Sequence, residues 1–154
     1  MQVTLLCIGK LGRSVEGALA LDYAARATAA GRAHALGPVS IREVEARKPG
    51  KAAEAGILLE RMADAHVIAC DEHGQARTSR DFAGRLARLR DDGVRRLVIL
   101  IGGADGLDDS VLAAAHERMA FGPQTWPHAL ARVMLAEQTY RAATILGGSP
   151  YHRD

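Results

Sequence analysis

The sequence predicts an α/β fold in which helices flank a mostly parallel sheet. Residues 1–154 are expected to form one domain. Short apolar segments of strand length alternate with amphipathic segments of helix length along the whole chain. Residues 97–101 are apolar without a break, which is typical of a strand that helices cover on both faces. Apolar residues make up 48% of the chain and aromatic ones only 4%, so Ala, Val, Leu and Ile must build the core.

The N-terminal half is expected to contain two strands and two helices. Residues 3–8 are a short apolar run ended by Gly9, and residues 39–44 alternate between apolar and polar side chains. Ala55, Leu58 and Met62 follow at helical spacing. We therefore expect a strand over 3–8, a helix from a Ser14 cap to about residue 30 with Gly31 as its stop, a strand over 39–44, a basic turn over 47–51 and a helix over 52–64.

The C-terminal half continues the alternation. We expect a strand over 65–70 that ends in a turn at 71–74, a helix that Thr78 or Ser79 caps and 92–93 stops, the strand 97–101, a short helix from Asp108 or Asp109 to 115, a weak strand within 116–121 and a last helix from about 127 to 143. Gly147 and Gly148 are then expected to release a short tail over residues 149–154.

Two loops follow predicted strands and could hold a ligand, namely 71–74 and the glycine-rich segment 102–106. Ligands of open parallel sheets bind beyond the carboxyl ends of the strands, and glycine lets the backbone approach them closely. The glycines could equally serve only a tight strand-to-helix turn. Neither a Gly-Lys-Ser/Thr phosphate loop nor GxGxxG is present, which argues against a nucleotide triphosphatase or a dinucleotide dehydrogenase.

Charge and cysteine content restrict the remaining classes. A formal net charge of +2 permits a nucleic-acid partner without demanding one. Cys7 and Cys70 lie in predicted strands, and no Cys/His spacing indicates a metal site. No segment approaches the ~20 apolar residues of a membrane span, and the N-terminus has no basic region of a signal peptide. We expect a cytoplasmic protein without metal and without a membrane anchor.

The last third of the chain concentrates residues that bear chemistry. His128 and Arg132 share one side of the last predicted helix, whereas Ala129, Val133, Ala136 and Tyr140 form a stripe suited to a core or an interface. Taken alone, His128 could cap its helix, Arg132 and Arg141 could be surface residues, and residues 151–153 could be a frayed end.

Four motifs in order identify a resemblance. They are LIGGADG at 100–106, WPHALAR at 126–132, EQTYRA at 137–142 and PYHR at 150–153. The opening VTLLCIGK at 3–10 and the turn RKPGK at 47–51 fit as well, so the similarity spans the chain. With these motifs the sequence resembles the RlmH family, the methyltransferases of N3 of a pseudouridine in large-subunit (23S) ribosomal RNA.

The resemblance implies a SPOUT fold, with a deep trefoil knot formed by about residues 70–154, and a homodimer whose protomers complete the active sites. It implies S-adenosylmethionine as cofactor and ribosomal RNA in the assembled ribosome as substrate. The cofactor pocket is expected to use Cys70, where the family usually has Leu, together with Gly102, Gly103, Phe121, Gly122, Pro123, Gln124, Thr125 and Trp126. Side chains expected in catalysis or RNA contact are Tyr151, His152, Arg153, Arg141, His128 and Arg132.

The tail is expected to carry the catalytic chemistry. Tyr151 could stack on the target base, His152 could relay the N3 proton, and Arg141 and Arg153 could hold phosphate. We hypothesise that it closes over the cofactor of the partner protomer. Two other hypotheses stay open: a non-catalytic ribosome-associated RNA-binding protein with the same fold, and a nucleotide-binding protein of the flavodoxin type.

Overall fold

The computed structural model describes residues 1–48 and 50–153. Its elements in chain order are β1 (Gln2–Ile8), α1 (Val15–Gly31), the short 3-10 helix η1 (Arg32–His34), β2 (Val39–Val44), α2 (Lys51–Met62), β3 (His66–Ala76), α3 (Ser79–Asp91), β4 (Arg96–Ile101), α4 (Asp109–Ala114), β5 (Glu117–Ala120) and α5 (His128–Leu146). Pro49 of the expected basic turn and Asp154 of the expected tail lie outside the described residues.

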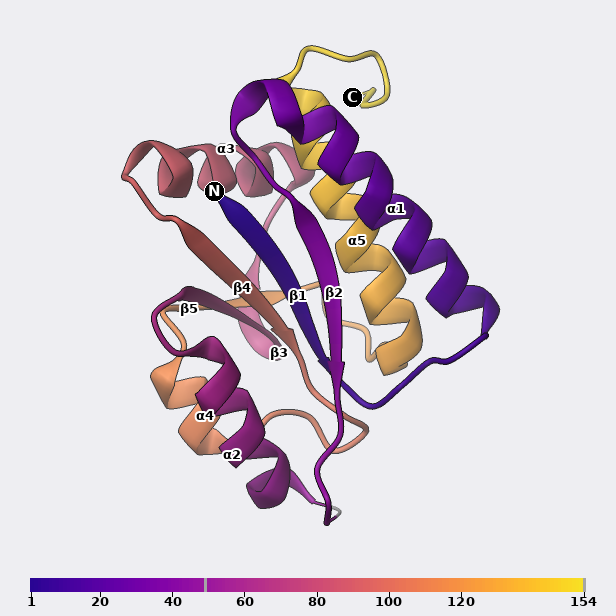
Figure 1. The fold of residues 1–154 in the computed structure, drawn as a ribbon, viewed down its shortest axis with the longest axis vertical. Helices are drawn as coiled ribbons and strands as arrows, with labels where there is room; N and C mark the ends of the chain where they lie inside the picture. The colour runs from indigo at the N-terminus through magenta and orange to yellow at the C-terminus, as the bar shows by residue number, and fades with distance from the viewer. Residues whose placement is uncertain (49, 154) are drawn as a thin grey trace.

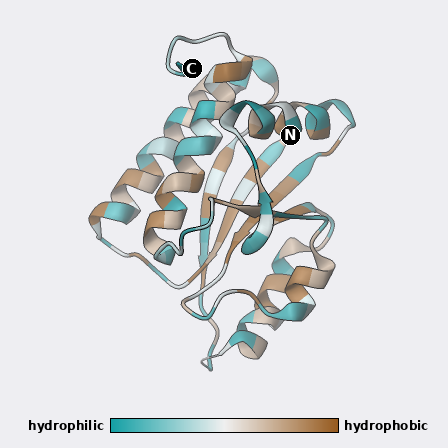
Figure 2. Cartoon of the chain, turned by 180° about the vertical axis from the view of Figure 1, so that it is seen from behind, coloured by the Kyte–Doolittle hydropathy of each residue, from teal (hydrophilic) through white to brown (hydrophobic). Residues whose placement is uncertain are grey.

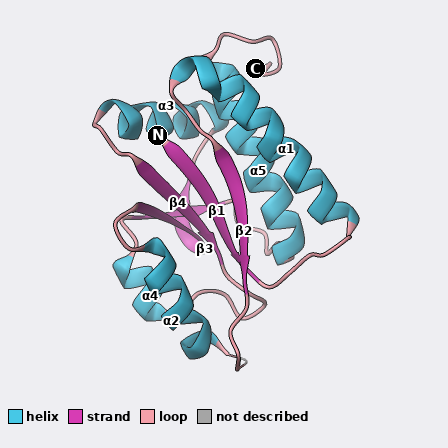
Figure 3. Ribbon diagram, in the orientation of Figure 1, coloured by secondary structure: helices cyan, strands magenta, loops and turns pink. Residues whose placement is uncertain are grey.

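The strands form one five-stranded sheet in the order β2-β1-β4-β3-β5 (Figure 3). All of its pairings are parallel, with Leu5 opposite both Ile41 and Ile99, for example. Because parallel neighbours need crossovers, helices must cover the faces. The predicted α/β class with a parallel sheet and flanking helices is confirmed.

Two helical layers enclose the sheet (Figure 1). α1, α3 and α5 cover one face through small and aliphatic residues such as Ala24, Leu86 and Leu135. α2 and α4 cover the other face through Leu58 and Val111. Hydrophobic colour therefore runs along the central strands, while hydrophilic colour gathers on outward turns of the helices (Figure 2). Among the described residues, the helices are too short or too polar to cross a bilayer.

The predicted helix starts are confirmed by their capping contacts. Ser14 Oγ accepts a hydrogen bond from Gly17 N at 3.0 Å, and Thr78 Oγ1 accepts one from Asp81 N at 3.1 Å. The Asp108 side chain accepts from Ser110 N in the same way. Each cap satisfies a backbone N–H that the first turn of a helix leaves without a partner.

β3 is longer than predicted, because the expected turn at 71–74 lies inside it. Met119 of β5 is opposite both Cys70 and Gln75, so residues 71–74 bulge out before the strand resumes. Gly74 permits this close approach, since a Cβ there would lie 2.5 Å from Met119 N.

Gly147 and Gly148 turn the tail back toward α5. The prediction that they release it is therefore wrong. Gly148 N donates to Ile145 O at 3.1 Å and Ser149 N to Thr144 O at 2.9 Å, the bond pattern of a Schellman motif. Gly148 adopts the left-handed φ of +65° that this motif requires. The structure does not test the trefoil knot, which stays a prediction.

Candidate functional site

A cavity of about 340 Å³ lies beyond the carboxyl end of β4, beside the bulge of β3 and the end of β5. The loop after β4, the segment after β5 and the first turn of α5 enclose it, as the position of ligand sites in parallel sheets predicts. Its lining residues are Cys70, Asp71, Glu72, 101–107, 119–122, 124–126, His128 and Ala131. We call it the strand-end pocket.

The residues assigned to the cofactor by resemblance come together in this pocket. Cys70, Gly102, Gly103, Phe121, Gly122, Gln124, Thr125 and Trp126 all line it. Pro123 lies in the same exposed segment but is not among the lining residues. His128, expected in catalysis, also lines the pocket; the N-cap of α5 is Pro127, so His128 does not cap its helix.

Glycine is required where the pocket meets the end of β4. A Cβ on Gly102 would lie 2.7 Å from the carbonyl carbon of Gly106. The loop folds back on itself because Gly106 N donates to Gly103 O at 3.1 Å, and Gly106 has a φ of +78°. Both sequence interpretations of these glycines therefore hold together: they make a tight turn, and that turn forms a pocket wall.

The pocket combines negative and apolar groups. Asp71, Glu72 and Asp105 bring carboxylates to it, whereas Met119 and Phe121 bring apolar side chains. Burial raises the pKa of the Cys70 thiol well above its ordinary value, which favours the neutral thiol. Sequence reasoning marked the two loops but missed the three carboxylates, whose convergence depends on the pairing of β3 with β4.

Arg132 is not at the surface, which corrects the expectation that it faces an RNA cleft. Its side chain is 1% exposed. Nη1 donates to Glu43 Oε1 at 2.7 Å, and Nη2 donates to the carbonyl oxygens of Ile8 and Gly9. Arg132 thus fixes α5 to the ends of β1 and β2, one turn after His128, and does not line the strand-end pocket.

The tail is docked on its own helix rather than frayed. Tyr151 and His152 are half-buried, and Arg153 is exposed. The Tyr151 ring contacts the Tyr140 ring, with 4.6 Å between their centroids, and the Arg141 guanidinium, which lies 4.9 Å from the Tyr151 ring centroid. Arg141 Nη1 is 3.2 Å from His152 Nδ1. The structure therefore brings Arg141, Tyr151 and His152 together.

The docked tail lies apart from the strand-end pocket. The tail leaves α5 at the end of the molecule where β1 begins (Figure 1). Tyr151 contacts Glu137, which is nine residues along α5 from the pocket residue His128, or about 14 Å at the helical rise per residue. Within one protomer, His128 and the tail therefore do not form a single cluster.

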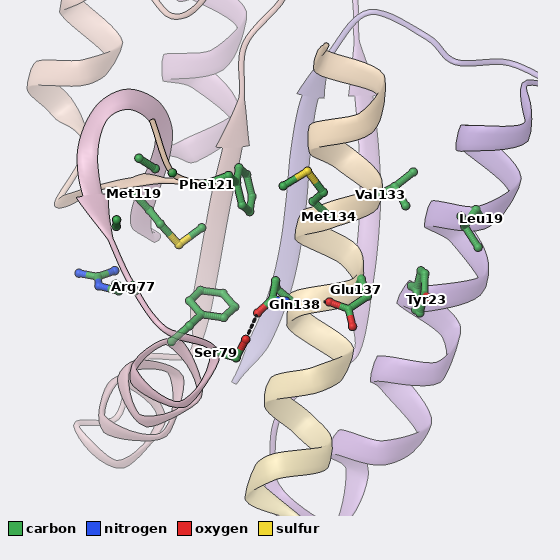
Figure 4. A pocket seen from close by; sticks show the side chains of 14 residues that line it. Leu19, Tyr23, Arg77, Ser79, Met119, Phe121, Val133, Met134, Glu137 and Gln138 are labelled. Atoms are coloured by element: carbon green, nitrogen blue, oxygen red, sulfur yellow. Dashed lines mark hydrogen bonds between the residues drawn. The ribbon is translucent and has the colours of Figure 1, made fainter. Parts of the chain in front are cut away.

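A second cavity of about 510 Å³ lies beside the first and shares residues 119–122 with it. Met119 and Phe121 face Met134 and Glu137 across it, and a hydrogen bond of 2.8 Å from Ser79 to Gln138 crosses its base (Figure 4). α1 adds Leu19 and Tyr23. We call it the α5 cavity.

β5, which supplies the shared wall, is anchored by a cluster that the sequence did not reveal. Glu117 accepts hydrogen bonds from Arg77 at 2.7 Å and Arg85 at 2.8 Å, and His66 lies 2.8 Å from the same carboxylate. Burial alone would raise the pKa of Glu117, but these hydrogen bonds outweigh it and hold the pKa at about 2. The described residues contain no group of three or more His, Cys, Asp or Glu arranged to hold a metal ion.

Comparisons with known proteins agree on one family. The family model described as "Predicted SPOUT methyltransferase" matches residues 1–152. Ribosomal RNA large subunit methyltransferase H of Caulobacter vibrioides is 74% identical over 100% of this chain and 99% of the relative. The protein of the same name from Phenylobacterium zucineum is 65% identical over 100% of both chains.

Solved structures with low sequence identity share the fold. A probable methylase family protein from Haemophilus influenzae matches with a TM-score of 0.57 and 15% identity, over 99% of this chain and 70% of that one. A probable methyltransferase from Bordetella pertussis matches with a TM-score of 0.54 and 16% identity, over 92% of this chain and 96% of that one.

Proposed function

Because the chain belongs to the SPOUT methyltransferases, among the ribosomal RNA large subunit methyltransferase H proteins, we propose that it methylates large-subunit ribosomal RNA with S-adenosylmethionine. The proposed target is N3 of a pseudouridine in 23S RNA. The observation that carries the cofactor assignment is the strand-end pocket, which gathers the assigned residues from three separate parts of the chain, with Pro123 as the exception.

The chemistry of the strand-end pocket fits this cofactor. S-adenosylmethionine supplies an electrophilic methyl group on a positively charged sulfonium. Asp71, Glu72 and Asp105 would favour such a cation, and Phe121 and Trp126 offer apolar surface to its adenine. The folded-back loop at Gly102 presents backbone groups to the ligand without a side chain in the way.

Methyl transfer from a sulfonium is a displacement in line, so the enzyme must above all position the attacking nitrogen and exclude water. We propose that His128 lies at the cofactor, where it can orient the target, and that Tyr151 stacks on the target base. His152 would take or relay the N3 proton, with Arg141 and the exposed Arg153 as phosphate contacts.

The distance between tail and pocket supports a shared active site in a homodimer. Antiparallel pairing of two α5 helices about a two-fold axis would bring the partner's tail beside the first turns of α5. On the predicted stripe, Ala136 is buried in the core, whereas Val133 and Tyr140 are half-buried. Leu130 on α5 and Leu19 on α1 are exposed apolar residues next to them, which such pairing would cover.

The proposed substrate is the assembled ribosome, in the cytoplasm. A net charge of +2 favours recognition of a shaped RNA surface over strong nonspecific binding. Additional contacts to the RNA phosphates would come from three exposed basic residues, Arg153, Lys48 and Lys51.

The test compares ribosomal RNA from cells with and without the gene by mass spectrometry. We expect one N3-methylated pseudouridine in 23S RNA to disappear and to return when the gene is restored. Unchanged RNA would refute the activity and favour a non-catalytic ribosome-binding protein.

A further inference from the structure

One carboxylate on α5 connects the helix with the tail. Glu137 Oε1 accepts hydrogen bonds from Arg141 Nη2 at 2.6 Å, from Arg141 Nε at 3.0 Å and from the Tyr151 hydroxyl at 3.0 Å. Its second oxygen accepts from Gln138 Nε2 at 2.8 Å. The Glu137 side chain is 17% exposed, so these groups replace much of its water.

The contacts of Glu137 continue into the tail. Arg141, which Glu137 orients through two hydrogen bonds, packs on the Tyr151 ring and lies within hydrogen-bond distance of His152. Burial and the hydrogen bond that its hydroxyl donates to Glu137 raise the pKa of Tyr151 above its ordinary value. The Tyr151 hydroxyl is therefore protonated at neutral pH and acts as the donor to Glu137.

An ordinary helix ion pair does not explain this arrangement. Pairs of Glu and Arg four residues apart on an exposed helix stabilise it only slightly, and they need no third partner. Here the third partner is fourteen residues away in sequence and belongs to the segment that the Schellman motif turns back toward α5. Glu137 is thus the point at which the returning chain is fixed.

We propose that Glu137 is a positioning residue, which holds Tyr151 and His152, through Arg141, in the geometry that methyl transfer needs. The proposal rests on the proposed function of the tail. Misplacement of a reacting group by about 1 Å can cost about 100-fold in rate, so a residue that fixes the tail affects turnover without touching the substrate. Cofactor affinity is not expected to depend on it.

The test is a double-mutant cycle between Glu137→Gln and removal of residues 151–154. Gln keeps the size of the side chain but cannot balance the charge of Arg141. In the full-length chain we expect turnover on ribosomes to fall about 10- to 100-fold, with the dissociation constant of S-adenosylhomocysteine unchanged. In the truncated chain the same substitution is expected to have no further effect. Glu60→Gln, on the exposed face of α2, is the matched control and should leave turnover unchanged.

A second measurement separates this inference from the proposed function. The NMR signals of the His152 imidazole are expected to narrow in the Glu137→Gln variant, because the tail becomes mobile, whether or not the protein methylates RNA. Unchanged His152 signals would overturn the proposal. So would equal losses of turnover in full-length and truncated chains, since Glu137 would then act as a wall of the α5 cavity. A wild-type protein without turnover would instead refute the methyltransferase assignment.

Discussion

Arg132 and Glu43 form an ion pair of 2.7 Å that joins the second turn of α5 to β2. Glu43 also accepts a hydrogen bond from Leu11 N at 3.0 Å, so the carboxylate holds the loop after β1 as well. The residue that sequence motifs assigned to RNA contact is therefore a fixed point beneath the strand-end pocket. Its orientation of α5 determines where His128 lies.

Loss of this ion pair should destabilise the fold. Arg132→Met leaves Glu43 and the carbonyl groups of Ile8 and Gly9 without their donor, and we expect the free energy of unfolding to fall by about 3 kcal/mol. Urea unfolding measures it. Arg88→Met, at an exposed position of α3, should change stability by less than about 0.5 kcal/mol. Equal effects of the two substitutions would show that the ion pair contributes nothing.

The close approach at Gly102 predicts a binding defect without unfolding. Gly102→Val places side-chain atoms against the backbone of Gly106, so the loop must open and the pocket wall must move. We expect the affinity for S-adenosylhomocysteine to fall at least about tenfold, equivalent to 1.4 kcal/mol, with the far-ultraviolet circular dichroism unchanged. Gly56→Val, where a Cβ meets nothing within 4 Å, is the control. Normal calorimetric titration of Gly102→Val would place the cofactor elsewhere.

Two Gly→Ala substitutions should change the stability of the protein in opposite directions. Gly148 has a φ of +65° and open space around its Cβ position, so alanine there suffers only backbone strain, about 1 kcal/mol. Gly56 lies within the helix α2 with the same open space, and alanine there should stabilise the protein by up to about 1 kcal/mol. Thermal unfolding of both variants checks this. A stabilising Gly148→Ala would contradict the Schellman motif.

The Glu117 cluster predicts a pH dependence of stability. The pKa of Glu117 is lowered from 4.5 to about 2, so its contribution is complete above pH 4.5 and disappears as the pH falls toward 2. Glu117→Gln should therefore cost about 3 kcal/mol at pH 7, because it leaves Arg77 and Arg85 without their carboxylate. The difference in the free energy of unfolding between wild type and Glu117→Gln should become smaller below pH 4.5. A difference that is the same at pH 3 and pH 7 would rule out the ion cluster as its source.

The sequence predicted what depends on local patterns. The Ser14 and Thr78 caps and the apolar run at 97–101 lie within single elements, and the helices and strands there begin and end close to the predicted positions. The bulge at 71–74 was not predictable, because it follows from the pairing of β3 with β5. In that pairing, Cys70 and Gln75 of β3 are both opposite Met119.

The site divides in the same way. The cofactor residues gather in one pocket because Cys70, Gly102 and the segment 121–126 lie where the paired parts of the parallel strands β3, β4 and β5 end. The burial of Arg132 escaped the sequence because helical periodicity gives the side of a helix but not the element that packs on it. The roles of Glu117 and Glu137 depend on partners distant in sequence, such as His66 and Tyr151.

We propose above all that S-adenosylmethionine bound in the strand-end pocket supplies the methyl group that is transferred to ribosomal RNA. The most direct measurement incubates purified ribosomal large subunits or whole ribosomes, from cells that lack the gene, with the protein and S-adenosylmethionine labelled in its methyl group. We expect about one label per 23S RNA at N3 of a pseudouridine, much less on naked RNA, and markedly less with Gly102→Val at the same cofactor concentration. Absence of label from the wild-type reaction, or equal labelling by wild type and Gly102→Val, would contradict the account.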